Sequence, residues 1–359
     1  FNLAFACSNA GGRDLLAIAW FRAYLAAAPD APDAAEVRKE IVKLEVKAEA
    51  AIQKLIRLAM DTAAEITTDD ISKRWAYNEI AAAQAKVGDI AGAKETAGSI
   101  TDYKVKSVAY IYIAQAQAAA GDIAGARETA ENITDGSDKS IAYRDIASIQ
   151  AEAGDIAGAI ETAAEITDDI PKSYAYRWIA EAQAKAGNIA GARETAASII
   201  DDDYKSEAYS RIAEAQAETG DIAGARKSLA LTKKAAERIE DDYNKSLAYR
   251  NIAAAQAKTG DMAGARESLA LAKKAAAEIA DDSTAIMYIA MAQAVTGDIA
   301  GARETAENIK NEIFKAAAYS SIAAAQAKAG DISGANATAE LTTDEDKPSV
   351  YEDIAAAQA

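Results

Sequence analysis

The sequence contains no histidine and a single cysteine, Cys7, among its 359 residues. Histidine is the commonest general base and metal ligand, so its absence excludes Ser-His and Cys-His catalytic arrangements. A lone cysteine excludes an intrachain disulfide framework and leaves the redox compartment undecided. Cys7 occupies an apolar helical position, and we interpret it as a buried structural residue rather than a nucleophile. We therefore predict a chain that is not an enzyme and holds no metal or cofactor.

Proline, aromatic residues and long apolar runs are also scarce. There are four prolines and 6% aromatic residues, whereas half of all residues are hydrophobic, mostly alanine. This alanine-rich composition favours closely packed helices. No apolar stretch approaches the ~20 residues that span a bilayer, so we expect no membrane insertion. The acidic net charge of −17 argues against nucleic acid and anionic membrane surfaces as partners.

The chain shows no secretory signal pattern, and it opens at Phe1 inside what reads as the middle of a helix. We expect residues of the gene product to precede Phe1, and any targeting signal with them. The compartment, cytoplasmic or exported, therefore stays open for a chain that we expect to be soluble.

One alanine-rich pattern, such as "AYRWIAEAQAKAGNIAGARETA" at 175–196, recurs along most of the chain. Aligned on its Ile-Ala pair, the copies share one mostly aromatic position, which we call the aromatic slot. The slot falls at Tyr77, Tyr110, Tyr143, Tyr176, Tyr209, Tyr249, Ile286, Tyr319 and Tyr351. Successive spacings are 33, 33, 33, 33, 40, 37, 33 and 32 residues, which indicates stacked supersecondary units.

Each unit has the periodicity of a helical hairpin. Tyr143, Ile146, Ala147 and Gln150 form one helical stripe, Gly154 ends the helix and an aspartate caps the next one. A glycine also recurs inside each second helix, where it costs about 1 kcal/mol relative to alanine, and we attribute it to close helix contact. The 40-residue unit carries seven extra residues in its second helix, about two turns, which keeps the apolar face in register.

The pattern resembles the tetratricopeptide repeat over roughly residues 67–359. The positions that carry the resemblance are Tyr143, Ile146, Ala147, Gly154, Ala159 and Pro171. The chain departs from the family at Gln150, where tyrosine is usual, and at Ala163, where a large aromatic residue is usual. The resemblance implies an all-α fold, a right-handed α-solenoid of stacked helix-turn-helix repeats, with a groove lined by the first helices.

The first 66 residues differ from the main array. Residues 1–32 resemble a more typical but partial repeat, with Gly12, Ala17, Phe21 and Pro29 on the family positions. Residues 33–66 read as one long connecting helix, with a break near Glu45–Ala48 as the alternative. Its expected buried seam is Val37, Ile41, Leu44, Ala48, Ala51, Leu55, Leu58 and Thr62. Residues 67–359 then form an array of eight units plus a partial last one.

Two recurring polar features allow a functional and a structural interpretation. Acidic pairs in the loops, Asp69–Asp70, Asp168–Asp169, Asp201–Asp203, Asp241–Asp242 and Asp281–Asp282, suggest either calcium ligands or solvated carboxylates at helix starts. We favour the second interpretation, because the spacing of a calcium loop is missing. A glutamine recurs at Gln84, Gln117, Gln150, Gln183, Gln216, Gln256, Gln293, Gln326 and Gln358. We favour a structural hydrogen bond from it to the backbone or to a neighbouring repeat over a ligand channel.

The groove-lining positions differ from unit to unit, and apolar, aromatic and arginine side chains there are typical of binding hot spots. The candidate partner-binding residues are Trp75, Asn78, Lys86, Ile111, Arg144, Tyr174, Arg177, Lys185, Arg250 and Lys258. We predict a protein-interaction scaffold that binds a partner peptide or helix on this concave face. Two alternatives stay open: a structural subunit that self-associates through its solenoid ends or joins a larger assembly, and an enzyme or small-molecule sensor.

Overall fold

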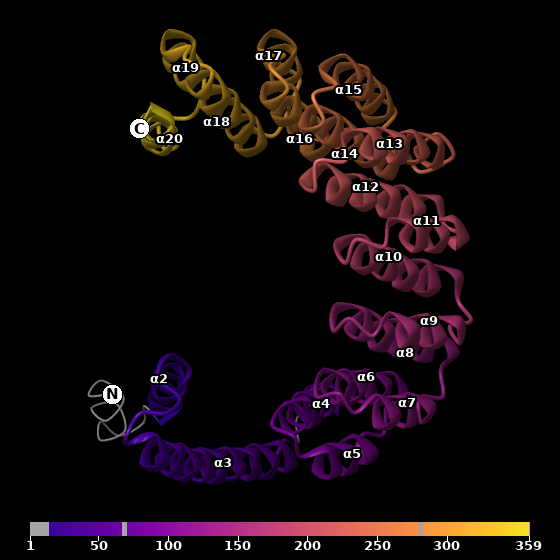
Figure 1. Ribbon diagram of the computed structural model, residues 1–359, viewed down its shortest axis with the longest axis vertical. Helices are drawn as coiled ribbons and strands as arrows, with labels where there is room; N and C mark the ends of the chain where they lie inside the picture. The colour runs from indigo at the N-terminus through magenta and orange to yellow at the C-terminus, as the bar shows by residue number, and fades with distance from the viewer. Residues whose placement is uncertain (1–13, 67–69, 280–282, 359) are drawn as a thin grey trace. The chain divides into compact units, whose positions relative to one another are not determined.

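The computed structural model describes residues 14–66, 70–279 and 283–358, and every regular element in these ranges is an α-helix (Figure 1). Consecutive helices pair into hairpins, and successive hairpins stack on one another within each unit. The predicted all-α fold of stacked helical repeats is therefore confirmed. The chain divides into two compact units, residues 1–139 and residues 140–359, which we describe one at a time.

Unit 1 holds one N-terminal helix pair and two shorter hairpins. Its helices are α2 (Asp14–Ala27), α3 (Ala34–Ala64), α4 (Asp70–Lys86), α5 (Ile90–Ser99), α6 (Tyr103–Ala119) and α7 (Ile123–Glu131). Ala17 and Phe21 of α2 are buried against Val37, Ile41 and Leu44 of α3. Helix α3 runs without a break through the segment where an interruption near Glu45 was the alternative.

The second half of the expected seam on α3 lies in a different register. Leu55 and Leu58 are 65% and 61% exposed, whereas Ile56 and Ala63 are buried against α4. The helix packs against α2 with its N-terminal half and against α4 with its C-terminal half, and the buried positions shift by one residue from the heptad pattern in the second half. The prediction of one heptad-like buried stripe along the whole of α3 is therefore wrong for its second half. Leu55 and Leu58 instead line a shallow apolar hollow of about 440 Å³ beside α4.

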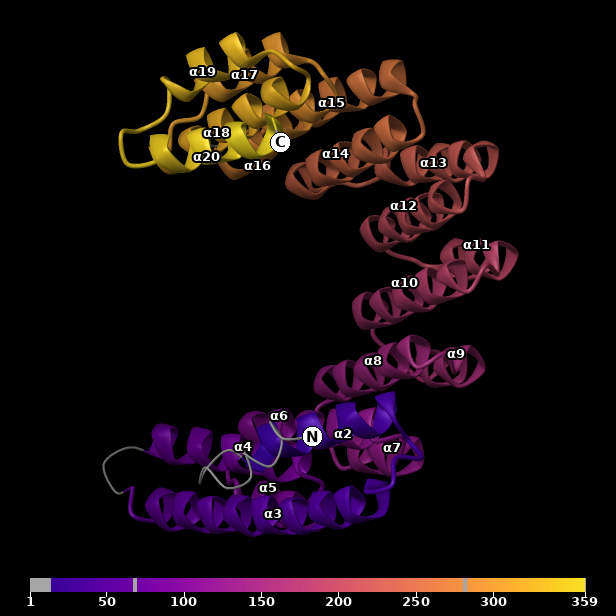
Figure 2. The same ribbon diagram turned by 60° about the vertical axis from the view of Figure 1, so that its left-hand side comes forward.

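Unit 2 begins within α8 and contains the longest continuous stack. Its helices are α8 (Gly136–Glu152), α9 (Ile156–Ala164), α10 (Asp169–Lys185), α11 (Ile189–Ser198), α12 (Asp202–Glu218), α13 (Ile222–Ala236), α14 (Asp242–Lys258), α15 (Met262–Ala277), α16 (Ser283–Val295), α17 (Ile299–Glu307), α18 (Glu312–Lys328), α19 (Ile332–Ala339) and α20 (Lys347–Gln358). The even-numbered helices from α10 to α20 lie side by side, and the odd-numbered helices lie behind them (Figures 1 and 2). Unit 2 is thus a two-layer stack, and its even-numbered layer carries the candidate site.

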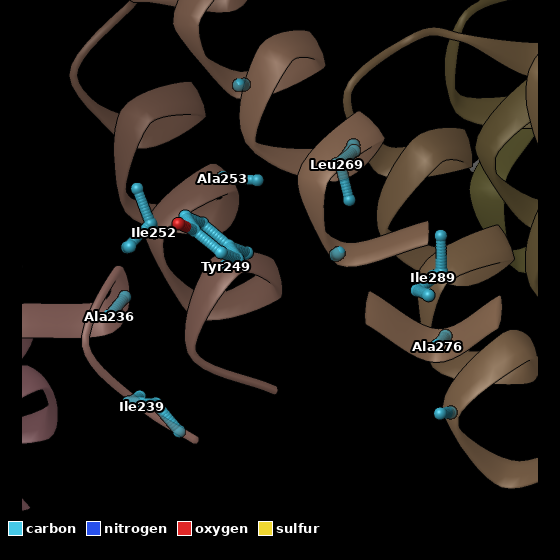
Figure 3. Close-up of a cluster of buried hydrophobic side chains, with 11 residues drawn as sticks. Ala236, Ile239, Tyr249, Ile252, Ala253, Leu269, Ala276 and Ile289 are labelled. Atoms are coloured by element: carbon cyan, nitrogen blue, oxygen red, sulfur yellow. The ribbon is translucent and has the colours of Figure 1, made fainter. Parts of the chain in front are cut away.

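The core of each hairpin repeats the same few side chains. Between α14, α15 and α16, for example, Tyr249, Ile252, Leu269 and Ile289 are buried together (Figure 3). Alanines fill the closest approaches between helices, as Ala253 does at 0% exposure. Because alanine adds little width, the helices pack closely, and the larger isoleucine and tyrosine side chains fill the space between successive hairpins.

A glycine turn and an aspartate cap connect the two helices of each hairpin. Gly154 adopts φ +88°, a conformation that favours glycine, and the Asp155 amide donates to the Gln150 carbonyl over 2.9 Å. The Asp155 carboxylate then accepts from the Gly158 amide over 3.0 Å and caps α9. The predicted helix end and N-cap are both confirmed.

The repeated glutamine is a structural part of this connection. Gln150 donates to Asp155 Oδ2 over 2.8 Å and accepts from Thr162 Oγ1 over 2.7 Å, so it joins both helices of the hairpin. The same pair of bonds occurs at Gln117, Gln216 and Gln326. This supports the structural interpretation over a ligand channel.

The bonds of Gln150 also revise the reason for the glycine inside each second helix. A Cβ on Gly158 would lie 2.2 Å from Asp155 Oδ2 and 2.3 Å from Gln150 Nε2. The glycine therefore makes room for the glutamine and aspartate side chains that cap its helix, rather than for another helix backbone.

Candidate functional site

One face of the even-numbered layer in unit 2 differs from repeat to repeat. Its positions lie two before, one after, two after and five after each aromatic slot, and this spacing places them along one side of a helix. We call this surface the variable face. From α8 to α16 it comprises Ile141, Arg144, Asp145 and Ser148; Tyr174, Arg177, Trp178 and Glu181; Glu207, Ser210, Arg211 and Glu214; Leu247, Arg250, Asn251 and Ala254; and Thr284, Met287, Tyr288 and Met291.

The variable face of α8 and α10 is organised around Tyr174. The Arg144 and Arg177 guanidinium groups lie 5.0 and 5.1 Å from the Tyr174 ring centroid, within cation–π distance. Arg177 also lies 4.1 Å from the Trp178 ring. Tyr204 from α12 approaches Tyr174 edge-on, with ring centroids 5.7 Å apart. Aromatic and arginine side chains therefore join three successive first helices.

Arg177 is almost completely enclosed and has its charge balanced within the fold. Its residue is 6% exposed, and Nη1 lies 3.0 Å from Glu181 Oε2 and 3.5 Å from Glu207 Oε1. Arg211 lies over the same two carboxylates and donates to Glu214 over 3.1 Å. Desolvation opposes the charge of Arg211, but these three glutamates together raise its pKa. The α10–α12 surface is thus a closed ionic network.

Arg250 occupies the same repeat position as Arg177 but has a different environment. Its Nη2 donates to Asn251 Oδ1 over 3.1 Å, and its guanidinium lies 4.7 Å from the Tyr288 ring. In the part of the chain that the structure describes, no carboxylate forms an ion pair with Arg250, and burial lowers the pKa of its guanidinium. A partly buried cation without a counter-charge is a favourable place for an anion.

A cleft of about 570 Å³ lies between α12 and α14 on this face. Arg250, Arg211 and Glu207 line it together with apolar side chains such as Tyr204 and Leu247. Thr232 and Ile239 also line it, and both belong to the seven-residue extension of α13 and the loop after it. The extension of the second helix and the loop after it therefore form part of the wall of this cleft.

Asp203 lines the end of the cleft where α12 and α14 begin. Its Oδ2 accepts from Asn244 Nδ2 over 2.8 Å, whereas its Oδ1 is covered and has no hydrogen-bond partner. Burial raises the pKa of the Asp203 carboxyl, and the nearby charge of Asp201 raises it further. Asp201 caps α12, accepting from the Asp203 and Tyr204 amides over 3.0 and 3.1 Å.

The structure divides the predicted partner-binding residues into accessible and enclosed ones. Lys185 and Lys258 lie beside the variable face, in the last turns of α10 and α14, with their side chains 67% and 62% exposed, and they pair with Glu181 and Glu214. Arg144, Tyr174 and Arg250 lie on the same face. Of the candidates, Asn78, Ile111 and Arg177 are 1%, 8% and 6% exposed, so they offer little surface to a partner.

The other candidates lie in unit 1. Trp75 is 48% exposed on α4, and Lys86 is exposed in the last turn of the same helix. They remain candidates for a separate surface in that unit.

Two of the described acidic pairs supply a helix cap, whereas Asp168 at the start of α10 makes no side-chain cap bond. Asp201 and Asp241 cap α12 and α14, and Asp202 pairs with Arg238. Within the described ranges, no group of three acidic or cysteine side chains is arranged to hold a metal ion. Cys7, Asp69 and the pair Asp281–Asp282 lie outside the described residues. No described helix combines the length and the apolar content needed to cross a bilayer.

Several site residues were not among the sequence candidates. Trp178, Arg211 and Tyr288 all occupy the position two after the aromatic slot, which also varies between units and would have been a usable signal. Asp203 and Asn244 lie in the first turns of their helices, outside the repeating stripe. Only the pairing of two separate repeats brings these two side chains together.

The fold is that of a helical-repeat protein. Its core, turn and cap residues recur from repeat to repeat, whereas the residues of the variable face do not. No family model matches the chain, and no curated protein matches it in sequence. Among solved structures, the chain is similar to Ton1535 from Thermococcus onnurineus NA1, with 17% identity over 77% of this chain and 98% of that one and a TM-score of 0.27.

Two further similar structures come from longer chains. One belongs to Naa15/Naa10 bound to HypK-THB, with 16% identity, 92% of this chain covered and a TM-score of 0.27. The other is the Signal Transduction ATPase with Numerous Domains protein PH0952 from Pyrococcus horikoshii, which has a tetratricopeptide repeat sensor, with 14% identity, 95% covered and a TM-score of 0.32. The chain spans 60% and 53% of their lengths.

Proposed function

We propose that the chain is a non-catalytic scaffold that binds a segment of a partner protein on the variable face of unit 2. The observation that carries the proposal is the contrast between frame and face. The core, turn and cap residues repeat almost unchanged, whereas the variable face differs at nearly every repeat and concentrates aromatic and charged side chains. Such side chains dominate protein-binding hot spots, and a purely structural repeat has no need of a different surface in every unit.

The test uses phage-displayed random peptides of about twelve residues, selected on the complete chain. The variant Arg144→Glu, Lys185→Glu, Lys258→Glu reverses one cation of the variable face and the two lysines beside it, and all three lie outside the cleft. Its matched control, Arg226→Glu, Lys227→Glu, Lys234→Glu, makes the same charge change at exposed positions of α13. Enriched peptides that bind wild type and control but not the variant support the proposal. Equal binding to all three proteins, or no enrichment, overturns it.

The alternative is a structural subunit whose ends stack on further copies of the chain. Sedimentation velocity over a hundredfold range of concentration distinguishes the two functions. A sedimentation coefficient that rises steadily with concentration, together with no peptide enrichment, favours the structural subunit. A constant coefficient with enrichment favours the scaffold.

A further inference from the structure

The cleft between α12 and α14 has the size and wall chemistry of a small-molecule site. Its volume of about 570 Å³ lies within the usual range of about 300–1,000 Å³ for ligand pockets. Tyr204, Ile239 and Leu247 supply apolar wall, and charged side chains of opposite sign lie along it. A ligand with one positive and one negative group can pair with both kinds of side chain, which fixes its orientation, while its apolar part is buried against the wall.

The acidic end of the cleft has unused hydrogen-bonding capacity. An ionised carboxylate offers about four acceptor sites, and Asp203 receives a single donor, Asn244. Its neighbours are occupied, because Asp201 caps α12, Asp202 pairs with Arg238, and Asp241 caps α14 by accepting from the Asn244 amide over 2.8 Å. Asp203 lines the cleft, and its Oδ2 accepts a single donor, the Asn244 side-chain amide, so the remaining lone pair of Oδ2 can accept from an ammonium group in the cleft.

The basic end of the cleft has unused donors. A guanidinium group has five N–H donors, and for Arg250 one hydrogen bond to a protein acceptor is present, to Asn251. Tyr288 covers one face of the guanidinium but cannot balance its charge. Arg211 lies on the same cleft, but it is already surrounded by Glu181, Glu207 and Glu214. Arg250 is therefore the cation that is available to an anionic ligand.

The two ends are separated by a defined stretch of helix. The Asp203 side chain bonds to Asn244, and Arg250 follows Asn244 by six residues on α14, a rise of about 9 Å. The two groups lie nearly two helical turns apart along α14, so a ligand that meets both needs several methylene groups between its amine and its carboxylate, whereas the adjacent charges of glycine are too close together.

We propose that the α12–α14 cleft binds a small zwitterion, an ω-amino acid whose ammonium group contacts Asp203 and whose carboxylate contacts Arg250. The site takes a free small molecule and does not depend on the partner binding proposed above. Its ligand class follows from the two unbalanced groups and their separation.

Isothermal titration calorimetry on the complete chain tests this with 6-aminohexanoate as the probe. Hexanoate and hexylamine carry one charge each, and glycine carries both charges too close together. The expected result is saturable binding of 6-aminohexanoate, with each of the three comparison compounds at least about tenfold weaker. Equal binding of the singly charged compounds, or no binding of any ω-amino acid from four to eight carbons, overturns the proposal.

Three variants at two site residues, with two matched controls, locate the site. Asp203→Asn and Arg250→Gln each remove one charge with little change in shape, and each is expected to weaken binding about tenfold. Arg250→Lys keeps the positive charge but loses the planar guanidinium group, so we expect its affinity to lie between those of wild type and Arg250→Gln. Asp242→Asn and Arg144→Gln remove the same charges outside the cleft and are expected to leave affinity within about twofold. Circular dichroism confirms that each variant is folded, and wild-type affinity in both site variants contradicts the assignment.

Discussion

Arg177 and Arg250 hold the same position in their repeats, directly after the tyrosine of the aromatic slot, yet their surroundings are opposite. Glu181 and Glu207 neutralise Arg177, and two aromatic rings enclose it. Arg250 has one amide partner and one ring, and it borders an open cleft. A repeated frame therefore does not make repeated sites, because the few positions that differ decide whether a surface is closed or available.

The extension of α13 is the second difference between the two regions. Helix α11 has 10 residues and α13 has 15, and the residues after the added turns, including Ile239, line the cleft. The seven-residue insertion keeps the buried face of the helix in register. It leaves the hairpin core intact while changing the surface between α12 and α14.

The largest expected effect on the closed region comes from Tyr174→Ala. Tyr174 contacts two guanidinium groups and the edges of Trp178 and Tyr204. We expect its loss to lower the free energy of unfolding by about 3 kcal/mol. The matched change Tyr288→Ala removes a 41% exposed ring with one cation contact. We expect it to lower the free energy of unfolding by about 1 kcal/mol.

Urea unfolding followed by circular dichroism measures both tyrosine variants. Hydrogen-exchange mass spectrometry of α10–α14 then localises the loss, since repeat arrays do not always unfold in one step. Equal losses for Tyr174→Ala and Tyr288→Ala would erase the distinction between the two regions.

Glu181→Gln is the next largest change. It removes one carboxylate from beside the enclosed Arg177, which retains Glu207 at 3.5 Å. Because breaking a buried ion pair leaves an uncompensated charge, we expect a loss of about 2 kcal/mol in unfolding free energy. Glu214→Gln, at the more exposed end of the same network, should cost about 0.5 kcal/mol. Thermal melts of both variants check this, and a larger effect at Glu214 would contradict the closed network.

Asn251→Asp should give Arg250 a carboxylate partner, which makes its surroundings more like those of Arg177. The equivalent pair on α8 is Arg144–Asp145, with Nη2 and Oδ1 2.6 Å apart, whereas Arg250 meets an amide in its place. We expect Asn251→Asp to raise the free energy of unfolding by about 0.5 kcal/mol and to weaken 6-aminohexanoate binding. The reverse change, Asp145→Asn, should lower stability by a similar amount without affecting that binding. Retained ligand affinity in Asn251→Asp would show that Arg250 is not the carboxylate-binding group.

The smallest effect concerns the pH dependence at Asp203. Its pKa is raised in the folded chain, so ionisation costs stability above that pKa, and the cost disappears as the pH falls through it. Asp203→Asn should therefore be more stable than wild type at pH 7, by about 0.5 kcal/mol after allowing for solvent screening. The difference should vanish near pH 4. Melting temperatures across this interval test the sign, and a variant less stable at pH 7 would contradict it.

The sequence by itself determined the hairpin unit. Gly154, Asp155 and the Ile-Ala pair of each first helix act over a few residues of chain, and their recurrence at 33 residues revealed the stack directly. Structural hydrogen bonds at Gln150 were also predicted, because a buried amide needs partners. The expected partners were backbone groups or a neighbouring repeat, whereas the side chains of Asp155 and Thr162 in its own hairpin supply them. In these cases the interacting groups lie close in sequence.

Only the tertiary structure decided which face residues are enclosed and which are available. Glu207 on α12 pairs with Arg177 on α10, and Tyr288 on α16 covers Arg250 on α14. In both cases the partner comes from the following repeat. Packing against a neighbouring helix also decides the buried residues of α3, where Ile56 and Ala63 are buried instead of the predicted Leu55 and Leu58. Local propensity and periodicity act within a helix or a hairpin, whereas burial and charge balance depend on side chains 30 or more residues away, whose approach is set by how the hairpins stack.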